Sequence, residues 1–247
     1  MCVMEQAIQK PKMTAIWVIL IYCAMQFSGI VLNIPAILNI FLEASGLQGQ
    51  EARIWAVGMW NTAAFAIATA LTLFITNRDK DFWNIFKGQQ QASLGETIGW
   101  GFAGFILVMF AQYIAIYIET LIGIPQGSDN TATIMEISKI APAMLLATVL
   151  FGPILEEILF RRIIFGSFVG RFGFIIAALI SSFVFAVIHF DFAHILIYVA
   201  CGFTFAFVYY KTKRILASII THILMNGFVA LSIFIVPQQA TILFPWL

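Results

Sequence analysis

The sequence predicts an all-α, polytopic membrane protein, a bundle of about seven transmembrane helices. Hydrophobic residues make up 62% of the 247 residues, and only 10% are charged, whereas soluble domains carry roughly 25% charged residues. The mean hydropathy is +0.97. A soluble core could not hide this much apolar surface. Because one membrane crossing takes ~20 apolar residues, the chain is long enough for several crossings with short connections.

Seven apolar runs follow one another along the chain, separated by polar residues, glycine or proline. They are residues 13–41, 54–76, 97–123, 140–169, 172–190, 192–210 and 215–236. We predict one helix per run, because backbone groups in lipid must satisfy one another and the runs are too long and uniformly apolar for barrel strands. Eight spans is the alternative, if one long run is broken.

The segments between the runs are polar. Residues 77–95 are typical of a surface loop, with or without a short interfacial helix, and residues 124–139 of an external loop. We divide the chain into an N-terminal three-helix region (1–139), a helical core with the motifs described below (140–236) and a C-terminal tail (237–247).

Basic residues predict the orientation. Of the 13 lysines and arginines, all except Arg53 and Lys139 fall on the N-terminal side of the predicted membrane. The positive-inside rule then places the N-terminus in the cytoplasm and the C-terminus outside. The short loops and the absence of soluble domains favour a bacterial plasma membrane. The net charge is only +1, and the lysines and arginines form no basic cluster. Nucleic-acid binding therefore has no support.

Charged residues interrupt the fourth run. Glu156 and Glu157 are adjacent, and Arg161 and Arg162 follow about one turn later. An ionisable side chain at the bilayer centre costs roughly 2.5–3.5 kcal/mol, so these residues need a reason. Glu157 and Arg161 have the i, i+4 spacing of a helical ion pair, which leaves Glu156 as the free carboxylate and a candidate general base. A purely structural charge network is the alternative.

The fifth run ends in a histidine. His189 follows Phe185 by one helical turn, and taken alone it reads as a satisfied interfacial residue. Asp191 and His194 come just after it, in a predicted external turn, and we interpret both as loop residues.

The seventh run carries His222 and Asn226 at i, i+4. An imidazole and a carboxamide on one helix face can both donate to one oxygen, as oxyanion stabilisation requires. A hydrogen-bond pair between two helices is the alternative.

The three interruptions together resemble the signature of a known family, the CPBP (Abi) family of CAAX proteases and bacteriocin-processing enzymes. The resemblance covers about residues 140–235 and rests on three motifs, Glu156-Glu157-x-x-x-Arg161, Phe185-x-x-x-His189 and His222-x-x-x-Asn226.

The resemblance implies an intramembrane endopeptidase with a catalytic cavity between the fourth, fifth and seventh spans. The implied roles are a general base that activates water (Glu156), a residue that holds this water (His189), oxyanion donors (His222, Asn226), residues that fix the helix geometry (Glu157, Arg161) and a packing neighbour of His189 (Phe185). These residues stand at different heights along their predicted helices, so a tilted or broken helix must bring them together.

The expected partners are membrane lipid and a membrane-associated peptide or protein substrate, and we do not expect a prenylated one. The resemblance favours a mechanism without a cofactor. Zn²⁺ held by Glu156, His189 and His222 is the alternative. Two other functions are weighed against the protease: a proton- or ion-coupled transporter with these residues as a relay, and a non-catalytic immunity or scaffold protein.

Overall fold

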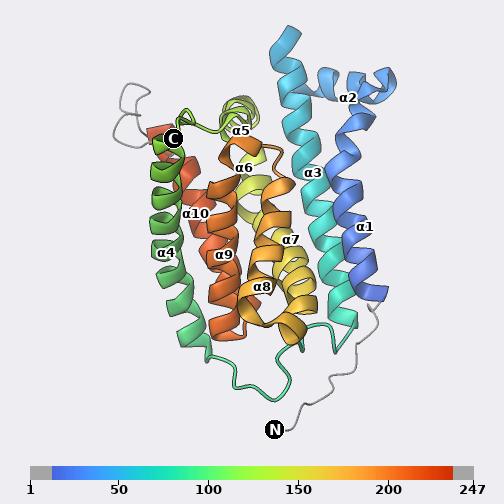
Figure 1. The fold of residues 1–247 in the computed structure, drawn as a ribbon. Coiled ribbons are helices and arrows are strands. Elements are labelled where there is room, and N and C mark those ends of the chain that lie inside the picture. Colours follow the sequence, from blue (N-terminus) through green and yellow to red (C-terminus); the bar gives the residue numbers. More distant parts are fainter. Residues whose placement is uncertain (1–12, 236–247) are drawn as a thin grey trace.

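The computed structural model describes residues 13–235, and every regular element in that part is a helix (Figure 1). The chain is therefore a polytopic helix bundle, as predicted. Lys10, Lys12 and the predicted tail 237–247 lie outside the described residues.

No strand lies between the helices in the described part of the chain. In order, they are α1 (Met13–Phe27), η1 (Ser28–Asn33), α2 (Pro35–Ser45), α3 (Gly49–Arg78), α4 (Leu94–Leu121), α5 (Asp129–Ile140), α6 (Met144–Leu146), η2 (Ala147–Phe151), α7 (Gly152–Glu156), η3 (Glu157–Phe165), α8 (Gly166–Val187), η4 (Phe192–His194), α9 (Ile195–Thr212) and α10 (Ile215–Ile235).

Six continuous helical stretches in residues 13–235 are long and apolar enough to cross a membrane. The fourth of them, Met144–Val187, has 44 residues and contains Gly173 with φ 75° and ψ 178°, which is not helical. The Ser181 hydroxyl donates to the Phe160 carbonyl over 2.7 Å, although 21 residues of straight helix would separate them by about 30 Å. The chain therefore reverses at Gly173, and the described residues make seven passes along the bundle.

The outer surface of the bundle is apolar. On α4 alone, large hydrophobic side chains are exposed at several positions, including Phe102, Ile106, Phe110 and Tyr117. Exposed apolar surface on this scale suits a lipid environment, because a soluble monomer rarely carries patches larger than a few hundred Å². Together with the six long apolar stretches, it makes the chain an integral membrane protein.

The first predicted span, 13–41, is wrong at its C-terminal end. The apolar run continues, but the first pass ends at Asn33, and α2 begins at Pro35 and lies across the end of the bundle (Figure 1). Proline lacks an N–H and disfavours the α-conformation in the preceding residue. Ile34 is accordingly extended, with ψ 114°, so a turn replaces the predicted helix.

The two polar segments differ from each other. Residues 79–88 form turns without a helix and are attached to the bundle by the buried rings of Phe82 and Phe86. The predicted external loop 124–139 instead contains α5. Its helix starts where the Ser128 hydroxyl accepts the Thr131 N–H over 3.1 Å, a side-chain cap that stabilises a helix start.

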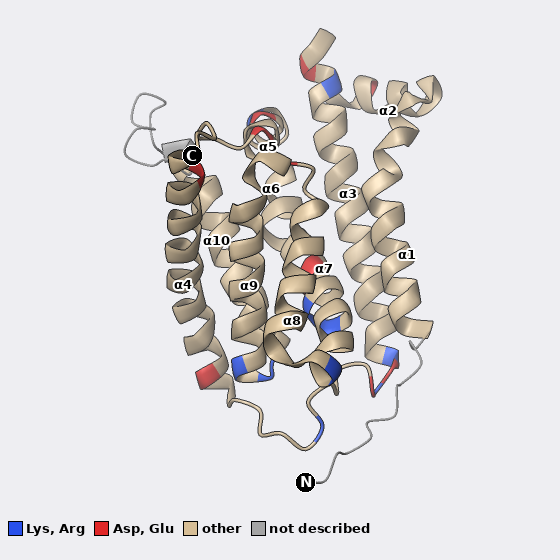
Figure 2. Ribbon diagram, in the orientation of Figure 1, with Lys and Arg blue, Asp and Glu red and all other residues tan. Residues whose placement is uncertain are grey.

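Basic residues gather at one end of the bundle (Figure 2). This end holds the α3–α4 loop, the reversal at Gly173 and the α9–α10 turn, with Arg78, Lys80, Lys87, Arg171, Lys211, Lys213 and Arg214. Arg53, near the start of α3, and Lys139, near the end of α5, lie toward the opposite end.

α4 packs closely against α9 and α10 because of its glycines. α4 contacts both α9 and α10, and a Cβ added at Gly104 would lie 2.3 Å from the Thr221 Oγ1 and 2.8 Å from the Val208 Cγ2. Small residues permit such close approach of membrane helices.

Gly104→Ala is therefore expected to push α4 away from α9 and α10 and to destabilise the bundle by about 1–3 kcal/mol, the usual cost of overpacking. Gly99→Ala is the matched control on the same helix, since a Cβ there meets nothing within 4 Å. The measurement is the thermal unfolding midpoint of the purified protein in detergent. Equal midpoints for the two variants would contradict the close packing.

Candidate active site

The fourth apolar stretch is widened where it carries the first motif. The segments η2 and η3 are π-helical, a geometry found mostly as short bulges and often at functional sites. In η2 the Gly152 N–H bonds back to the Ala147 carbonyl, and Pro153 has no N–H to offer. The Thr148 carbonyl is left without a helical partner, and the Asn226 side chain on α10 donates to it over 2.8 Å. This bond ties α10 to the widened helix.

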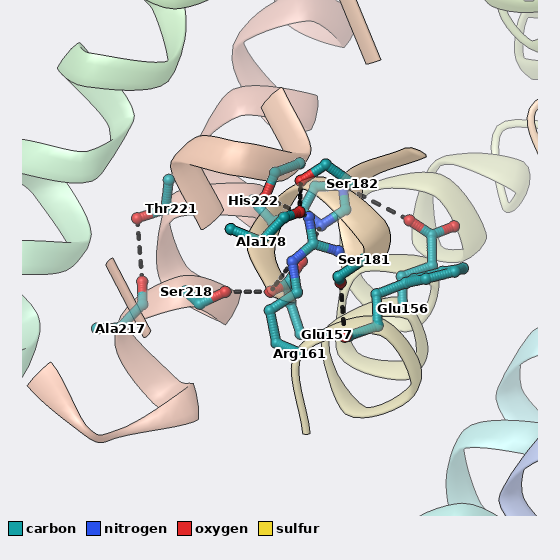
Figure 3. A network of polar contacts seen from close by, with 12 residues as sticks. Glu156, Glu157, Arg161, Ala178, Ser181, Ser182, Ala217, Ser218, Thr221 and His222 are labelled. Atoms are coloured by element: carbon teal, nitrogen blue, oxygen red, sulfur yellow. Dashed lines mark hydrogen bonds and ion pairs between the residues drawn. The ribbon is translucent and has the colours of Figure 1, made fainter. Parts of the chain in front are cut away.

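Glu157 is completely buried and is the centre of a polar network (Figure 3). Its Oε2 lies 3.3 Å from the Arg161 Nε, as the i, i+4 spacing predicts, and also accepts the Ser218 hydroxyl. Its Oε1 lies 3.0 Å from the His222 Nδ1. Glu157 thus joins η3 to α10.

Arg161 is also completely buried and reaches two further helices. Its Nη2 donates to the Gly202 carbonyl on α9 over 3.1 Å. Its guanidinium carbon lies 4.6 Å from the ring centre of Phe185 on α8 and 5.0 Å from that of Phe205 on α9. Cation–π contacts of this kind strengthen when the cation is desolvated. The guanidinium is therefore held between aromatic faces.

Glu156 points away from this network. Adjacent helical residues project about 100° apart, and the Glu156 side chain is 14% exposed while that of Glu157 is fully buried. Glu156 lines a cavity, and its Oε2 lies 3.7 Å from the His222 Nε2, which is too long for a hydrogen bond. Among the described residues, Glu156 is thus the carboxylate of the motif that remains open to the cavity.

The two motif histidines are each oriented through Nδ1. The His189 Nδ1 lies 2.7 Å from the Phe185 carbonyl, and the His222 Nδ1 contacts the Glu157 carboxylate. Carbonyl and carboxylate oxygens only accept, so each Nδ1 carries the proton. The Nε2 atom of each ring is left for the cavity, where it accepts a hydrogen bond in the neutral imidazole and donates one in the imidazolium.

Aromatic rings fix the planes of both imidazoles. His189 stacks on Tyr198, with ring centres 4.2 Å apart, and Phe185 packs at 4.7 Å from His189. His222 stacks on Phe205 at 4.4 Å. Phe185 thus packs beside His189, as the second motif implies.

The cavity has a volume of about 430 Å³ and is lined by the three histidines of the chain together with Glu156 and Asn226. The prediction placed it between the fourth, fifth and seventh spans, but α1, α3, α4 and α9 also contribute to its wall. Residues 124–128, which connect α4 to α5, line it too. The cavity therefore extends toward the end of the bundle opposite the basic residues.

Glu156, His189 and His222 are the residues that would hold zinc in the alternative mechanism. Within residues 13–235, no three His, Cys, Asp or Glu side chains converge as a metal-binding group, and the Nδ1 atoms of His189 and His222 already have partners. The Nε2 atoms remain open to the cavity, and we derive no step through a metal.

Sequence reasoning missed several residues of the site. Ser218 precedes His222 by one helical turn and could have been found from that spacing, whereas Tyr198 looks like any aromatic residue of an apolar run. His194 lies in the connection between α8 and α9, as interpreted, but in the short helical turn η4 and not on the surface. It is buried, and its Nδ1 lies 2.8 Å from an oxygen of Glu119 on α4, a partner 75 residues away that local patterns do not reveal.

Comparisons with known proteins agree with this geometry. A family model described as "Type II CAAX prenyl endopeptidase Rce1-like" matches residues 138–228. "Putative membrane peptidase YdiL" of Bacillus subtilis (strain 168) is 39% identical over 216 residues, 87% of each chain. "Membrane-embedded CAAX protease MroQ" of Staphylococcus aureus (strain USA300) is 32% identical over 232 residues, 89% of this chain and 90% of that one. The chain belongs to the CPBP family.

Membership of the CPBP family identifies the chain as an intramembrane protease and confirms the resemblance carried by the three motifs. The family model spans all of them. No solved structure matches the chain.

The buried Glu157–Arg161 pair of this CPBP protease gives a direct stability prediction. Arg161→Leu leaves the Glu157 carboxylate without its cation, and removing one partner of a buried pair typically costs about 3–5 kcal/mol. We expect a large fall in the thermal midpoint or in the folded yield from membranes.

Arg162→Leu is the matched control. Arg162 is the next residue of the same helix but is partly exposed, and its guanidinium carbon lies 4.5 Å from the centre of the Phe82 ring. An equal loss of stability in both variants would contradict the central place of the Glu157–Arg161 pair.

Proposed function

We propose that this CPBP protease hydrolyses a peptide bond of a membrane-associated peptide or protein with a water molecule activated by Glu156. The observation that carries the proposal is the division of labour between adjacent glutamates. Glu157 is engaged by Arg161, Ser218 and His222, whereas Glu156 faces the cavity without a hydrogen bond in the described residues. A carboxylate in a partly desolvated cavity suits general-base work.

In the first step, the Glu156 carboxylate takes a proton from the water, and the oxygen of this water attacks the carbonyl carbon of the substrate. The neutral His189 helps hold this water, because its Nε2 accepts a hydrogen bond when Nδ1 donates to the Phe185 carbonyl. The new C–O bond produces a tetrahedral oxyanion. Glu156 then passes its proton to the leaving nitrogen as the C–N bond breaks.

The oxyanion is stabilised by His222 and Asn226. Since Glu157 fixes the Nδ1 proton, a protonated His222 presents Nε2–H to the cavity. Asn226 has a second Nδ2 hydrogen after its bond to the Thr148 carbonyl. Preorganised donors of this kind typically contribute about 10²–10³-fold to the rate.

The reaction proposed here uses no cofactor. No group of three His, Cys, Asp or Glu side chains that could hold a metal ion is found within residues 13–235. A transporter finds no support among the relatives, both of which are named as peptidases or proteases. Loss of catalysis with retention of the fold, as in an immunity or scaffold protein, is a possible outcome of the first experiment below.

Charge asymmetry supports the orientation with the N-terminus in the cytoplasm and the C-terminus outside. The basic end of the bundle belongs to the cytoplasmic side by the positive-inside rule. A bacterial plasma membrane is the proposed location, and two bacterial relatives that are named as membrane proteins support it. The cavity, which extends toward the other end, then opens to the outer side. Its substrate is a membrane-associated peptide or protein that reaches the outer half of the bilayer.

Glu156→Gln is expected to lower the rate of peptide cleavage by at least about 10²-fold, the usual contribution of a positioned base, without a change in thermal midpoint. His222→Gln is expected to do the same through loss of the oxyanion donor. The assay uses purified protein in lipid nanodiscs, a panel of anchored membrane peptides, and mass spectrometry of the products, each with and without a strong zinc chelator.

Glu43→Gln, an exposed glutamate on α2, is the control and should cleave like wild type. Chelator-sensitive activity would overturn the cofactor-free mechanism. Full activity of Glu156→Gln would overturn the site, and a folded wild type that cleaves no peptide of the panel would favour the scaffold reading.

The orientation predicts which loops are reached from outside the cell. In a variant without native cysteines, Gln126→Cys in the α4–α5 connection should react with a membrane-impermeant maleimide on intact cells. Lys87→Cys in the α3–α4 loop should react only after permeabilisation. Both side chains are exposed, so accessibility is matched. The reverse labelling pattern would place the mouth of the cavity in the cytoplasm.

A further inference from the structure

A second buried polar pair lies in the wall of the same cavity. Glu119, near the end of α4, is 3% exposed, and His194 is 6% exposed. The His194 Nδ1 lies 2.8 Å from the Glu119 Oε2, and the Ile197 N–H donates to the Glu119 Oε1 over 3.4 Å. Both side chains line the cavity that also contains Glu156 and His222. The proposed reaction uses neither of them.

The cavity wall is acidic. Its lining includes the carboxylates of Glu119 and Glu156 but no lysine or arginine from residues 13–235. Ser128, in the same wall, donates to Asp191 over 2.6 Å and so holds a further carboxylate near the mouth. His194 is the basic side chain that contacts Glu119, and the described lining otherwise sets its carboxylates against no lysine or arginine. A cation that enters the cavity therefore meets a wall that carries negative charge.

A second acceptor lies on the same helix face. Gln112 and Ile116 precede Glu119 by seven and three residues, and all three line the cavity. The Gln112 Oε1 is buried and has no hydrogen-bond partner in the described residues. Such a buried acceptor calls for a donor. Seven residues of helix span about 10 Å, which matches about three residues of extended peptide. α4 thus offers acceptors at the spacing of an extended chain.

We propose that Glu119, positioned by His194, is a recognition subsite that binds the ammonium or guanidinium group of a substrate Lys or Arg side chain, while Gln112 accepts a backbone N–H of the same extended peptide. The subsite rests on the proposed protease function and extends it to sequence preference. Substrates with a basic residue a few positions from the cleaved bond are preferred over those with an acidic residue at that place.

Binding is tested separately from cleavage. The protein carries Glu156→Gln, so that bound peptide is not consumed, and is held in nanodiscs. The probes are fluorescent, N-acetylated peptides with an apolar segment of about 20 residues and a short Ala/Ser tail, in which one Lys is moved through each tail position in turn. Glu replaces Lys in a parallel series, and a lysine-free tail with a free N-terminus distinguishes a terminal ammonium from a side chain.

The expected result is about tenfold tighter binding for Lys than for Glu at one tail position, the order of one partly desolvated ion pair. Adding Glu119→Gln should reduce that ratio to less than about twofold, while Glu43→Gln should leave it unchanged. A preference that survives Glu119→Gln, or no preference at any position, overturns the subsite. Tightest binding of the lysine-free tail would assign the site to an N-terminal ammonium instead.

The two proposals fail in different ways. If the subsite is right and the protease mechanism is wrong, the Lys preference in binding persists although the wild type cleaves none of these peptides. If only the subsite is wrong, the wild type cleaves Lys and Glu peptides at the same rate. Glu119→Gln then leaves the ratio of the two cleavage rates unchanged.

Discussion

The ion pair of Glu157 with Arg161 is the interaction on which the arrangement of the bundle core depends. Neither charge can reach water, and each must be satisfied by protein. Glu157 does so through Ser218 and His222 of α10, and Arg161 through α9 and the aromatic rings of α8 and α9. A single pair of charges therefore fixes how four helical segments meet, and His222 takes its orientation from that meeting.

The same constraint separates the two adjacent glutamates. Glu157 is held by its ion pair and hydrogen bonds, and the helix geometry turns Glu156 toward the cavity. Glu156 is therefore the carboxylate that is available for chemistry. The π-helical segment before it adds a second link between the helices, because the Thr148 carbonyl that it leaves free is met by Asn226. Catalytic geometry and helix packing are thus built from the same side chains.

Much of this could be predicted from the sequence, and the limits have physical causes. The pair of Glu157 with Arg161 follows from i, i+4 spacing, and apolar runs locate the passes because lipid demands them. The reversal at Gly173 falls within a few residues of the predicted boundary between the fourth and fifth runs. The end of the first pass was missed because hydropathy continues past Pro35, whose effect is on backbone geometry. The partners of Asn226 and His194 could not be predicted, since both depend on contacts between helices far apart in sequence.

The reversal at Gly173 also has a consequence for how the protein is made. The limb after it, 174–187, is shorter than the ~20 apolar residues that a crossing requires, whereas the limb before it is long enough on its own. We expect the second limb to enter the bilayer together with the first, as a hairpin, because it has fewer apolar residues than one crossing needs. Glu156, Glu157 and Arg161 lie in the first limb. The segment with the first motif is thus expected to enter the bilayer as one unit.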